Sequence, residues 1–361
     1  MSKTNPLRIA FIGCGNISGP YGHCVAKRSR DLRIIGAFDE LKERASAFTK
    51  KHGGKVYASL DALLNDPEVE LVVNLTIHTA HAAVTKRALL AGKHVHSEKP
   101  LATNRAQGRE VVDLARRKRL LLSCSPFVIL GEAQQTLWKA VRDGRVGDVF
   151  AVNADMFWGR IESWHPNPVA FYSPGAGPML DVGCYPLNIL TSILGPVGEV
   201  RGLAKITMPR RVIQSGPNAG KKFRVTTPDT IFGLLTFANG TIGRLTTTFA
   251  PWHSTQAGLE IHGTKGSLSL PTTSDFNSPV RIATYPNREW KDIRLIGKPC
   301  KGVDWSRGLL DCAHAIRNRR PPSASGEQAF HILDVCLGIL EAARLGRAVK
   351  IKSRFNPPKP L

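Results

Sequence analysis

The stretch LRIAFIGCGNISG, residues 7–19, decides the fold of the first part of the chain. It contains an apolar run, Ile9 to Ile12, with the length and composition of a strand that is buried on both faces. The run ends at Gly13 and Gly15, and the residues that follow predict a helix that starts near Asn16. Strand, glycine turn and helix in this order are typical of the first half of a βαβ unit.

The next strand completes that unit and ends in an acidic residue. Leu32 to Phe38 repeats the apolar pattern, and Asp39 follows it directly. In such a unit the glycines let the backbone approach a pyrophosphate, and the carboxylate accepts hydrogen bonds from the adenosine ribose. The third glycine of the G-x-G-x-x-G pattern is replaced by Ser18, with Gly19 one residue later. The glycines alone fit an ordinary turn almost as well, but the complete unit favours dinucleotide binding.

The chain is expected to form two domains. The first, residues 1–125, continues its parallel sheet with strands at 69–75, 94–97 and 120–123. The second, residues 126–361, is predicted to be an α+β domain, because Asn239-Gly240 joins two β-rich arms in a pattern that indicates a hairpin. Two helices are expected to cover one face of the second sheet, at residues 304–318 and 327–345.

Charged residues follow a strand that should be buried. Glu98, Lys99 and Pro100 come directly after the strand that ends at Ser97, where charge is normally avoided. Ligands of open parallel sheets bind at the carboxyl ends of the strands, so this charge indicates a site. His94 and His96 share a face of that strand, but no third ligand has a suitable spacing, so no metal is expected.

Composition and charge limit the other classes of function. The 361 residues carry 50 basic and 28 acidic side chains, a net charge of +22. Both halves share the excess, and no helix-turn-helix, finger or aromatic RNA-binding pattern accompanies it, so no nucleic-acid partner is expected. The start of the chain lacks a secretory signal, no apolar run is long enough to cross a bilayer, and the seven cysteines are scattered. We therefore expect a cytoplasmic protein without a membrane partner.

Three motifs resemble one known family across nearly the whole chain. IGCGNISG, HVHSEKPLA and GAGPMLDVGCYPLNILTSILG, in this order and spacing, are similar to the glucose-fructose oxidoreductase / inositol dehydrogenase / MocA family. The resemblance implies an α/β protein, in which an N-terminal Rossmann domain precedes an α+β domain with a large, mainly antiparallel open sheet. It also implies a nicotinamide-dependent oxidoreductase that assembles as a homodimer or homotetramer.

The resemblance assigns roles around the dinucleotide. In the family the glutamate of the second motif lies near the nicotinamide ribose, the lysine reaches the reacting hydroxyl and the proline fixes the turn. These roles fall on Glu98, Lys99 and Pro100, and we expect NAD rather than NADP because Asp39 should repel a 2'-phosphate. The remaining residues assigned to the cofactor are Gly13, Gly15, Asn16, Ile17, Thr76 and His81.

The third motif supplies the candidate chemistry. Inositol dehydrogenase-like members carry Asp and His four residues apart, whereas this chain has Asp181 and Tyr185, which one helix would place on one face. A phenol with a pKa of about 10 is a poor base until a neighbouring ammonium lowers that pKa. Lys99 is therefore expected to activate Tyr185 or to hold the substrate oxygen, with Asp181 orienting the pair. Which residue takes the proton stays open, and Tyr185 as a half-buried core aromatic is the alternative.

The segment ESWHPNPVAFYSPGAGP is expected to contact the substrate. His165, Asn167 and Tyr172 could bind sugar hydroxyls, because carbohydrate sites combine planar hydrogen-bonding groups with aromatic faces. The resulting hypothesis is an NAD(P)-dependent enzyme that interconverts a secondary hydroxyl and a ketone on a sugar, sugar derivative or glycoside. The alternative is a catalytically silent dinucleotide- or sugar-binding regulator of the same fold.

Overall fold

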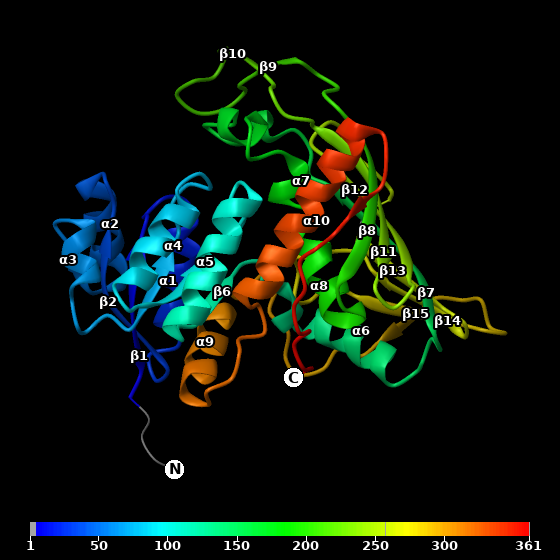
Figure 1. Ribbon diagram of the computed structural model, residues 1–361, viewed down its shortest axis with the longest axis horizontal. Coiled ribbons are helices and arrows are strands. Elements are labelled where there is room, and N and C mark those ends of the chain that lie inside the picture. Colours follow the sequence, from blue (N-terminus) through cyan, green and yellow to red (C-terminus); the bar gives the residue numbers. More distant parts are fainter. Residues whose placement is uncertain (1–4, 257, 361) are drawn as a thin grey trace. The chain divides into compact units, whose positions relative to one another are not determined.

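The computed structural model describes residues 5–256 and 258–360, and these form two compact units (Figure 1). The first unit contains the chain up to Phe127 together with Asp304–Phe330. The second contains Val128–Val303 and the chain from His331 onward. The domain limits expected from the sequence, 1–125 and 126–361, stay a prediction.

The first unit is built on a parallel sheet of six strands in the order β3-β2-β1-β4-β5-β6. The strands are β1 (Leu7–Ile12), β2 (Leu32–Phe38), β3 (Lys55–Val56), β4 (Leu71–Asn74), β5 (His94–Ser97) and β6 (Leu122–Cys124). The helices between them are α1 (Ser18–Ala26), α2 (Lys42–His52), α3 (Leu60–Leu64), α4 (His81–Leu90) and α5 (Arg105–Lys118). This alternation confirms the predicted Rossmann arrangement, and the fully buried β4 explains why its sequence is a continuous apolar run.

Helix α9 (Arg307–Arg317) belongs to the first unit, which corrects the expectation that residues 304–318 cover the second sheet. It packs near β2 and β5, with Leu309 and Cys312 fully buried. At Gly308 an added Cβ would lie 2.6 Å from the Phe127 ring and 3.0 Å from the His96 ring. The amphipathic pattern of α9 shows that one face is buried, but a pattern does not identify the sheet that buries it.

The second unit contains a nine-stranded, mainly antiparallel sheet in the order β16-β15-β14-β13-β7-β12-β11-β8-β17. Its strands are β7 (Val149–Phe157), β8 (Val197–Lys205), β11 (Thr230–Phe237), β12 (Ile242–Thr248), β13 (Gly258–Gly263), β14 (Gly266–Leu270), β15 (Val280–Thr284), β16 (Lys291–Ile293) and β17 (Val349–Lys350). β7 and β12 form the parallel pair. The Asn239-Gly240 turn joins β11 to β12, with Gly240 at a φ of 90°, so the predicted hairpin is confirmed.

Helices cover one face of that sheet. They include α6 (Glu132–Arg142), α8 (Cys184–Leu194) and α10 (Gly326–Leu345). At Gly202 of β8 and Gly233 of β11, an added Cβ would lie 2.3 Å and 2.8 Å from atoms of Ile339 in α10, so this helix packs directly on the strands. A short hairpin of β9 (Arg210–Val212) and β10 (Lys222–Arg224) stands outside the main sheet.

The lengths and compositions of the helices show whether any of them could cross a membrane. Within residues 5–256 and 258–360, every helix is too short or too polar to traverse a bilayer. The cytoplasmic location expected from the sequence stays a prediction.

Candidate active site

The loop after β1 leaves its backbone accessible. Gly13 has a φ of 87°, and a Cβ there would lie 2.7 Å from the carbonyl carbon of Leu75, so only glycine fits. At Gly15 nothing lies within 4 Å of the place a Cβ would take. Asn16 is exposed and Ile17 precedes α1 directly. These residues therefore form a turn whose open side leaves the main chain accessible, and their role in cofactor binding stays a prediction.

Asp39 ties the end of β2 to this loop. Its Oδ2 accepts a hydrogen bond from the Cys14 amide at 2.7 Å, and its Oδ1 accepts one from the Leu41 amide at 2.9 Å. A carboxylate oxygen has two lone pairs, so each oxygen can still accept a ribose hydroxyl. Burial and the charge of Asp39 raise the pKa of Cys14 to about 12. Cys14 is therefore a protonated, unreactive thiol, consistent with a packing role.

Thr76 and His81 connect the ends of β4 and β5. The His81 ring nitrogens lie 2.7 Å from the Pro100 carbonyl oxygen and 2.9 Å from that of Thr76. Asn74, which the sequence reasoning missed, donates to the His81 carbonyl at 2.9 Å and accepts from the Thr76 hydroxyl at 2.7 Å. Burial lowers the pKa of His81, which is 2% exposed. His81 thus bridges the loop after β4 and the loop after β5.

Glu98 is buried, and its carboxylate is held from several sides. Oε1 accepts from the Tyr21 hydroxyl at 2.8 Å and from the Ser125 hydroxyl at 2.9 Å, while Oε2 accepts from the Lys99 amide at 3.1 Å. Lys99 and Pro100 are half-buried at the same end of β5. Tyr21 and Ser125 could not be predicted as partners of Glu98, because nothing in their local sequence patterns distinguishes them from core or turn residues.

The two histidines of β5 have packing and capping roles, as expected. His94 Nδ1 accepts from the Leu121 amide at 2.9 Å. His96 is fully buried, and this burial lowers its pKa to about 3, so its ring is neutral.

Asp181 and Tyr185 lie on two short helices of the second unit. Asp181 ends α7 (Pro178–Asp181) and Tyr185 lies in the first turn of α8, whereas the sequence predicted one continuous helix. The break occurs at Gly183, where a Cβ would lie 2.6 Å from the Met179 carbonyl oxygen. Both side chains are half-buried. Tyr185 packs on a hydrophobic cluster made of Met156, Ile161, Tyr172, Val182, Val225 and Phe249.

The residues of the predicted substrate segment differ in how far they are exposed to solvent. Asn167 is exposed, and its amide donates to His165 Nδ1 at 3.1 Å. The His165 ring packs 4.8 Å from the ring of Phe171. Burial lowers the pKa of His165, while the charge of Asp181 opposes this shift, so the two side chains share one neighbourhood. Tyr172, by contrast, is fully buried and donates its hydroxyl to Glu162 at 2.5 Å, so it fixes the segment from inside.

A buried ion triad of Glu162, Arg211 and Asp229 anchors that segment. Arg211 Nη1 lies 2.7 Å from Glu162 Oε1, and its Nη2 lies 2.6 Å from Asp229 Oδ2, with all three side chains at most 3% exposed. The guanidinium also packs 4.7 Å from the Tyr172 ring centre. Asp229 accepts in addition from the Thr207 amide at 2.7 Å. The triad was missed from the sequence, where these residues look like ordinary surface charges.

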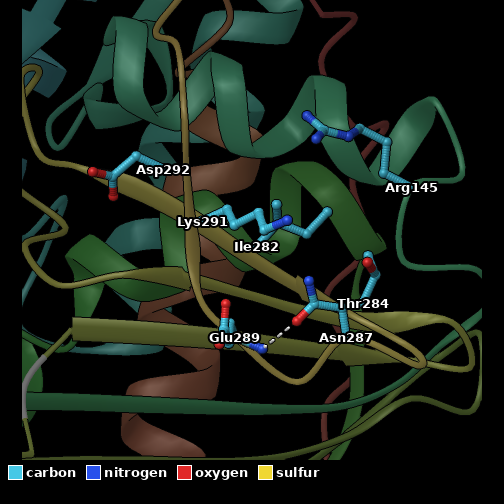
Figure 2. Close-up of a pocket in the computed structure, with 7 residues that line it drawn as sticks. All are labelled: Arg145, Ile282, Thr284, Asn287, Glu289, Lys291 and Asp292. Atoms are coloured by element: carbon cyan, nitrogen blue, oxygen red, sulfur yellow. Dashed lines mark hydrogen bonds between the residues drawn. The ribbon is translucent and has the colours of Figure 1, made fainter.

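One cavity of about 420 Å³ lies in the second unit, and Figure 2 shows its lining. The residues that line it are Arg145, Ile282, Thr284, Asn287, Glu289, Lys291 and Asp292. The Glu289 amide donates to Asn287 Oδ1 at 3.3 Å there (Figure 2). None of the site residues expected from the sequence contributes to this lining, so the cavity is separate from the candidate site.

A parallel-sheet unit with an open glycine loop and a carboxylate after β2, combined with an α+β unit, has the architecture of a dinucleotide-binding protein. Residues 7–125 match the model described as an oxidoreductase family with an NAD-binding Rossmann fold. Residues 134–269 match the GFO/IDH/MocA C-terminal domain. The chain therefore belongs to the GFO/IDH/MocA family of oxidoreductases.

Several known proteins are similar over most of their length. A 1,5-anhydro-D-fructose reductase of Ensifer adhaerens is 27% identical, over 91% of this chain and 94% of that protein. A trans-1,2-dihydrobenzene-1,2-diol dehydrogenase of Bos taurus is also 27% identical, over 84% of each. Among solved structures, levoglucosan dehydrogenase in complex with NADH and L-sorbose has a TM-score of 0.85 at 19% identity, covering 96% of this chain and 99% of that one. This last likeness establishes the fold.

Proposed function

We propose that the chain is an NAD(P)-dependent oxidoreductase that interconverts a secondary hydroxyl and a ketone on a sugar, sugar derivative or glycoside. The observation that carries this proposal lies in the first unit. The glycine loop, Asp39 and the Glu98-Lys99 pair follow the carboxyl ends of β1, β2 and β5, which belong to one parallel sheet. A dinucleotide site and an ammonium group therefore share the edge at which such sheets bind ligands.

The residues present fit a dinucleotide. Gly15 leaves room for a pyrophosphate against the main chain, and Asp39 retains acceptor capacity for a ribose. When bound, the nicotinamide would supply the hydride chemistry. The chain's own part is to hold the substrate hydroxyl and to move its proton, and we assign these tasks to Lys99, Asp181 and Tyr185. An ammonium stabilises a developing alkoxide and lowers the pKa of a neighbouring phenol, so that more of the phenol is present as the phenolate base.

The substrate class follows from the relatives and from the segment around His165. The named relatives act on anhydrofructose and on a dihydrodiol, both of which carry secondary hydroxyls. In this chain Trp164 is 49% exposed and stacks edge-on with His165 at 5.5 Å, while Asn167 presents an amide. Such a surface suits a sugar ring, with Tyr172 and the ion triad supporting it from within.

A direct test screens sugars and glycosides for a change in nicotinamide absorbance. Mass spectrometry of the native protein first identifies any co-purified nucleotide. Turnover of a secondary hydroxyl or its ketone supports the enzyme. If the protein binds the dinucleotide but no alcohol or ketone changes its absorbance, the catalytically silent regulator replaces this proposal.

The cofactor is expected to be NAD rather than NADP. Asp39 would repel a 2'-phosphate, although Lys42 and Arg44 lie close enough in sequence to offset part of that repulsion. Titrating both cofactors should therefore show tighter NAD binding, and Asp39→Asn should reduce the preference. The control Asp113→Asn, which removes a charge on α5, should leave the preference unchanged. Tighter NADP binding by the unaltered protein contradicts the assignment.

The protein is expected to be a homodimer or homotetramer. The sheet face opposite α10 exposes four apolar side chains, Leu203 (73%), Phe232 (48%), Leu234 (55%) and Ile242 (59%). Leu203 and Phe232 are direct cross-strand partners, while Leu234 pairs with Arg201 and Arg244, and Ile242 pairs with Thr236. The four side chains thus form an apolar patch interspersed with polar residues on β8, β11 and β12. A second copy of the same sheet would bury it.

Sedimentation velocity at micromolar concentration should accordingly show an oligomer. The double change Leu234→Glu and Ile242→Glu should shift it towards the monomer, since it would place charges in the interface. Leu90→Glu on α4, which is 52% exposed in the first unit, should have no such effect. A monomeric unaltered protein would rule out the assembly.

A further inference from the structure

Tyr21 of α1 lies at the centre of a buried polar network that the proposed reaction does not use directly. Its hydroxyl lies 2.8 Å from Glu98 Oε1, 3.0 Å from Ser125 Oγ and 3.2 Å from His96 Nε2. His96 Nδ1 lies 3.1 Å from Ser123 Oγ. The side chains of Tyr21, His96 and Ser123 are at most 1% exposed, and those of Ser125 and Glu98 are 4% and 7% exposed.

The Glu98 carboxylate sets the direction of the nearest hydrogen bonds. The Tyr21 hydroxyl donates to Glu98. A neutral imidazole donates from one nitrogen and accepts at the other, so His96 Nε2–H donates to the Tyr21 oxygen and Nδ1 accepts from the Ser123 hydroxyl. Ser125 has one hydroxyl hydrogen, which can go to Glu98 or to Tyr21. Ser123, His96 and Tyr21 thus form a series of donors that ends on the Glu98 carboxylate.

Residues from a distant part of the sequence pack against this network. The Trp305 ring packs 5.2 Å from the Tyr21 ring and 6.2 Å from that of Phe127. Next to it, Asp304 forms a 2.7 Å ion pair with Arg28, which follows α1. The segment before α9 thus packs on the ring of Tyr21, whose hydroxyl donates to Glu98 after the end of β5. Packing of this kind locks the rotamer of a side chain.

We propose that Tyr21 is a positioning residue for the nicotinamide end of the dinucleotide. It fixes the Glu98 carboxylate, whose Oε2 in turn accepts from the Lys99 amide at 3.1 Å, and so it sets the backbone from which the Lys99 side chain extends. This inference rests on the proposed function of Glu98 and Lys99. The competing explanation is a network that only stabilises the first unit.

The chain offers a matched control for the two explanations. Tyr57, in the same unit, is 7% exposed and donates its hydroxyl to Asp66 at 2.7 Å. Tyr57→Phe and Tyr21→Phe therefore remove the same group from the same kind of bond. The readouts are the dissociation constants of NADH and of ADP, which lacks both the nicotinamide and its ribose, together with kcat and KM.

Tyr21→Phe should weaken NADH binding by roughly tenfold, as expected for a lost hydrogen bond to a charged group, and should lower kcat. ADP affinity should stay unchanged, because the altered bond lies at Glu98 and not at the glycine loop. Tyr57→Phe should leave the ratio of the two dissociation constants and kcat as they are in the unaltered protein.

An unchanged ratio and unchanged kcat in Tyr21→Phe would overturn the inference, as would an equal loss for both nucleotides. If Tyr21→Phe fails to fold, Ser125→Ala, which removes the other donor to Oε1, must produce the same selective loss for NADH. The proposed function is tested separately. If the unaltered protein binds NADH but turns over no alcohol or ketone, the enzyme proposal fails, while the binding ratio still decides the role of Tyr21.

Discussion

Lys99→Met is expected to reduce turnover by roughly 100-fold or more, the loss typical of removing a positioned electrostatic or acid-base group. The fold and the affinity for NAD should change little, because the glycine loop and Asp39 hold the other end of the dinucleotide. Single-turnover kinetics at saturating cofactor, with NADH binding followed by fluorescence, measure the two effects separately. If NAD binding is lost while turnover at saturating cofactor survives, the lysine only positions the cofactor and this mechanism is wrong.

The same strand provides the control. Lys93 precedes β5, whereas Lys99 follows it, and Lys93 Nζ donates to the Asp66 carbonyl at 2.7 Å. Lys93→Met should therefore lower stability without affecting turnover, since it lies at the end of the strand opposite to the ligand-binding edge.

Tyr185→Phe should reduce turnover to a similar extent. If Lys99 and Tyr185 act on one proton, the two losses are far from additive in the double variant. Additive losses would show that the residues act independently, whereas unchanged turnover in Tyr185→Phe would leave Tyr185 as a half-buried aromatic that packs on its hydrophobic cluster.

Arg211→Met is expected to lower the free energy of unfolding by about 3–5 kcal/mol, because it leaves two buried carboxylates without their partner. Glu162 and Asp229 are 3% and 0% exposed, so water cannot replace the guanidinium. Urea unfolding of the variant and of the unaltered protein measures the difference. The segment that carries His165 should lose protection from hydrogen exchange first, since the triad fixes its position.

Arg281→Met is the appropriate comparison. Arg281 forms an ion pair of 3.2 Å with Asp292, in which the two side chains are 49% and 75% exposed. An exposed pair contributes little, so this change should cost less than about 1 kcal/mol. Equal costs for the two variants would mean that burial does not decide the strength of the Arg211 interaction.

Five of the six strands of the first unit could be predicted from the sequence to within two residues at each end, whereas β3 was not predicted. The apolar runs, the glycine turn and Asp39 predicted β1, α1 and β2, and the strand predicted at His94–Ser97 has those limits in the structure. These features are local: a buried strand needs a continuous apolar run, and a turn of this shape needs glycine at Gly13. The hairpin at Asn239-Gly240 was predictable for the same reason.

The sequence by itself thus determined the class of fold and the family, and it predicts the edge of the first sheet at which a ligand is expected to bind. The tertiary structure alone decided which side chains support that edge. Tyr21 and Glu98 are 77 positions apart, Arg211 and Glu162 are 49 apart, and Arg28 and Asp304 are 276 apart. Local patterns carry no information on such pairings, because a polar or amphipathic segment has the same sequence whichever partner finally buries it. The packing of α9 in the first unit and the burial of Tyr172 could be seen only in the tertiary structure.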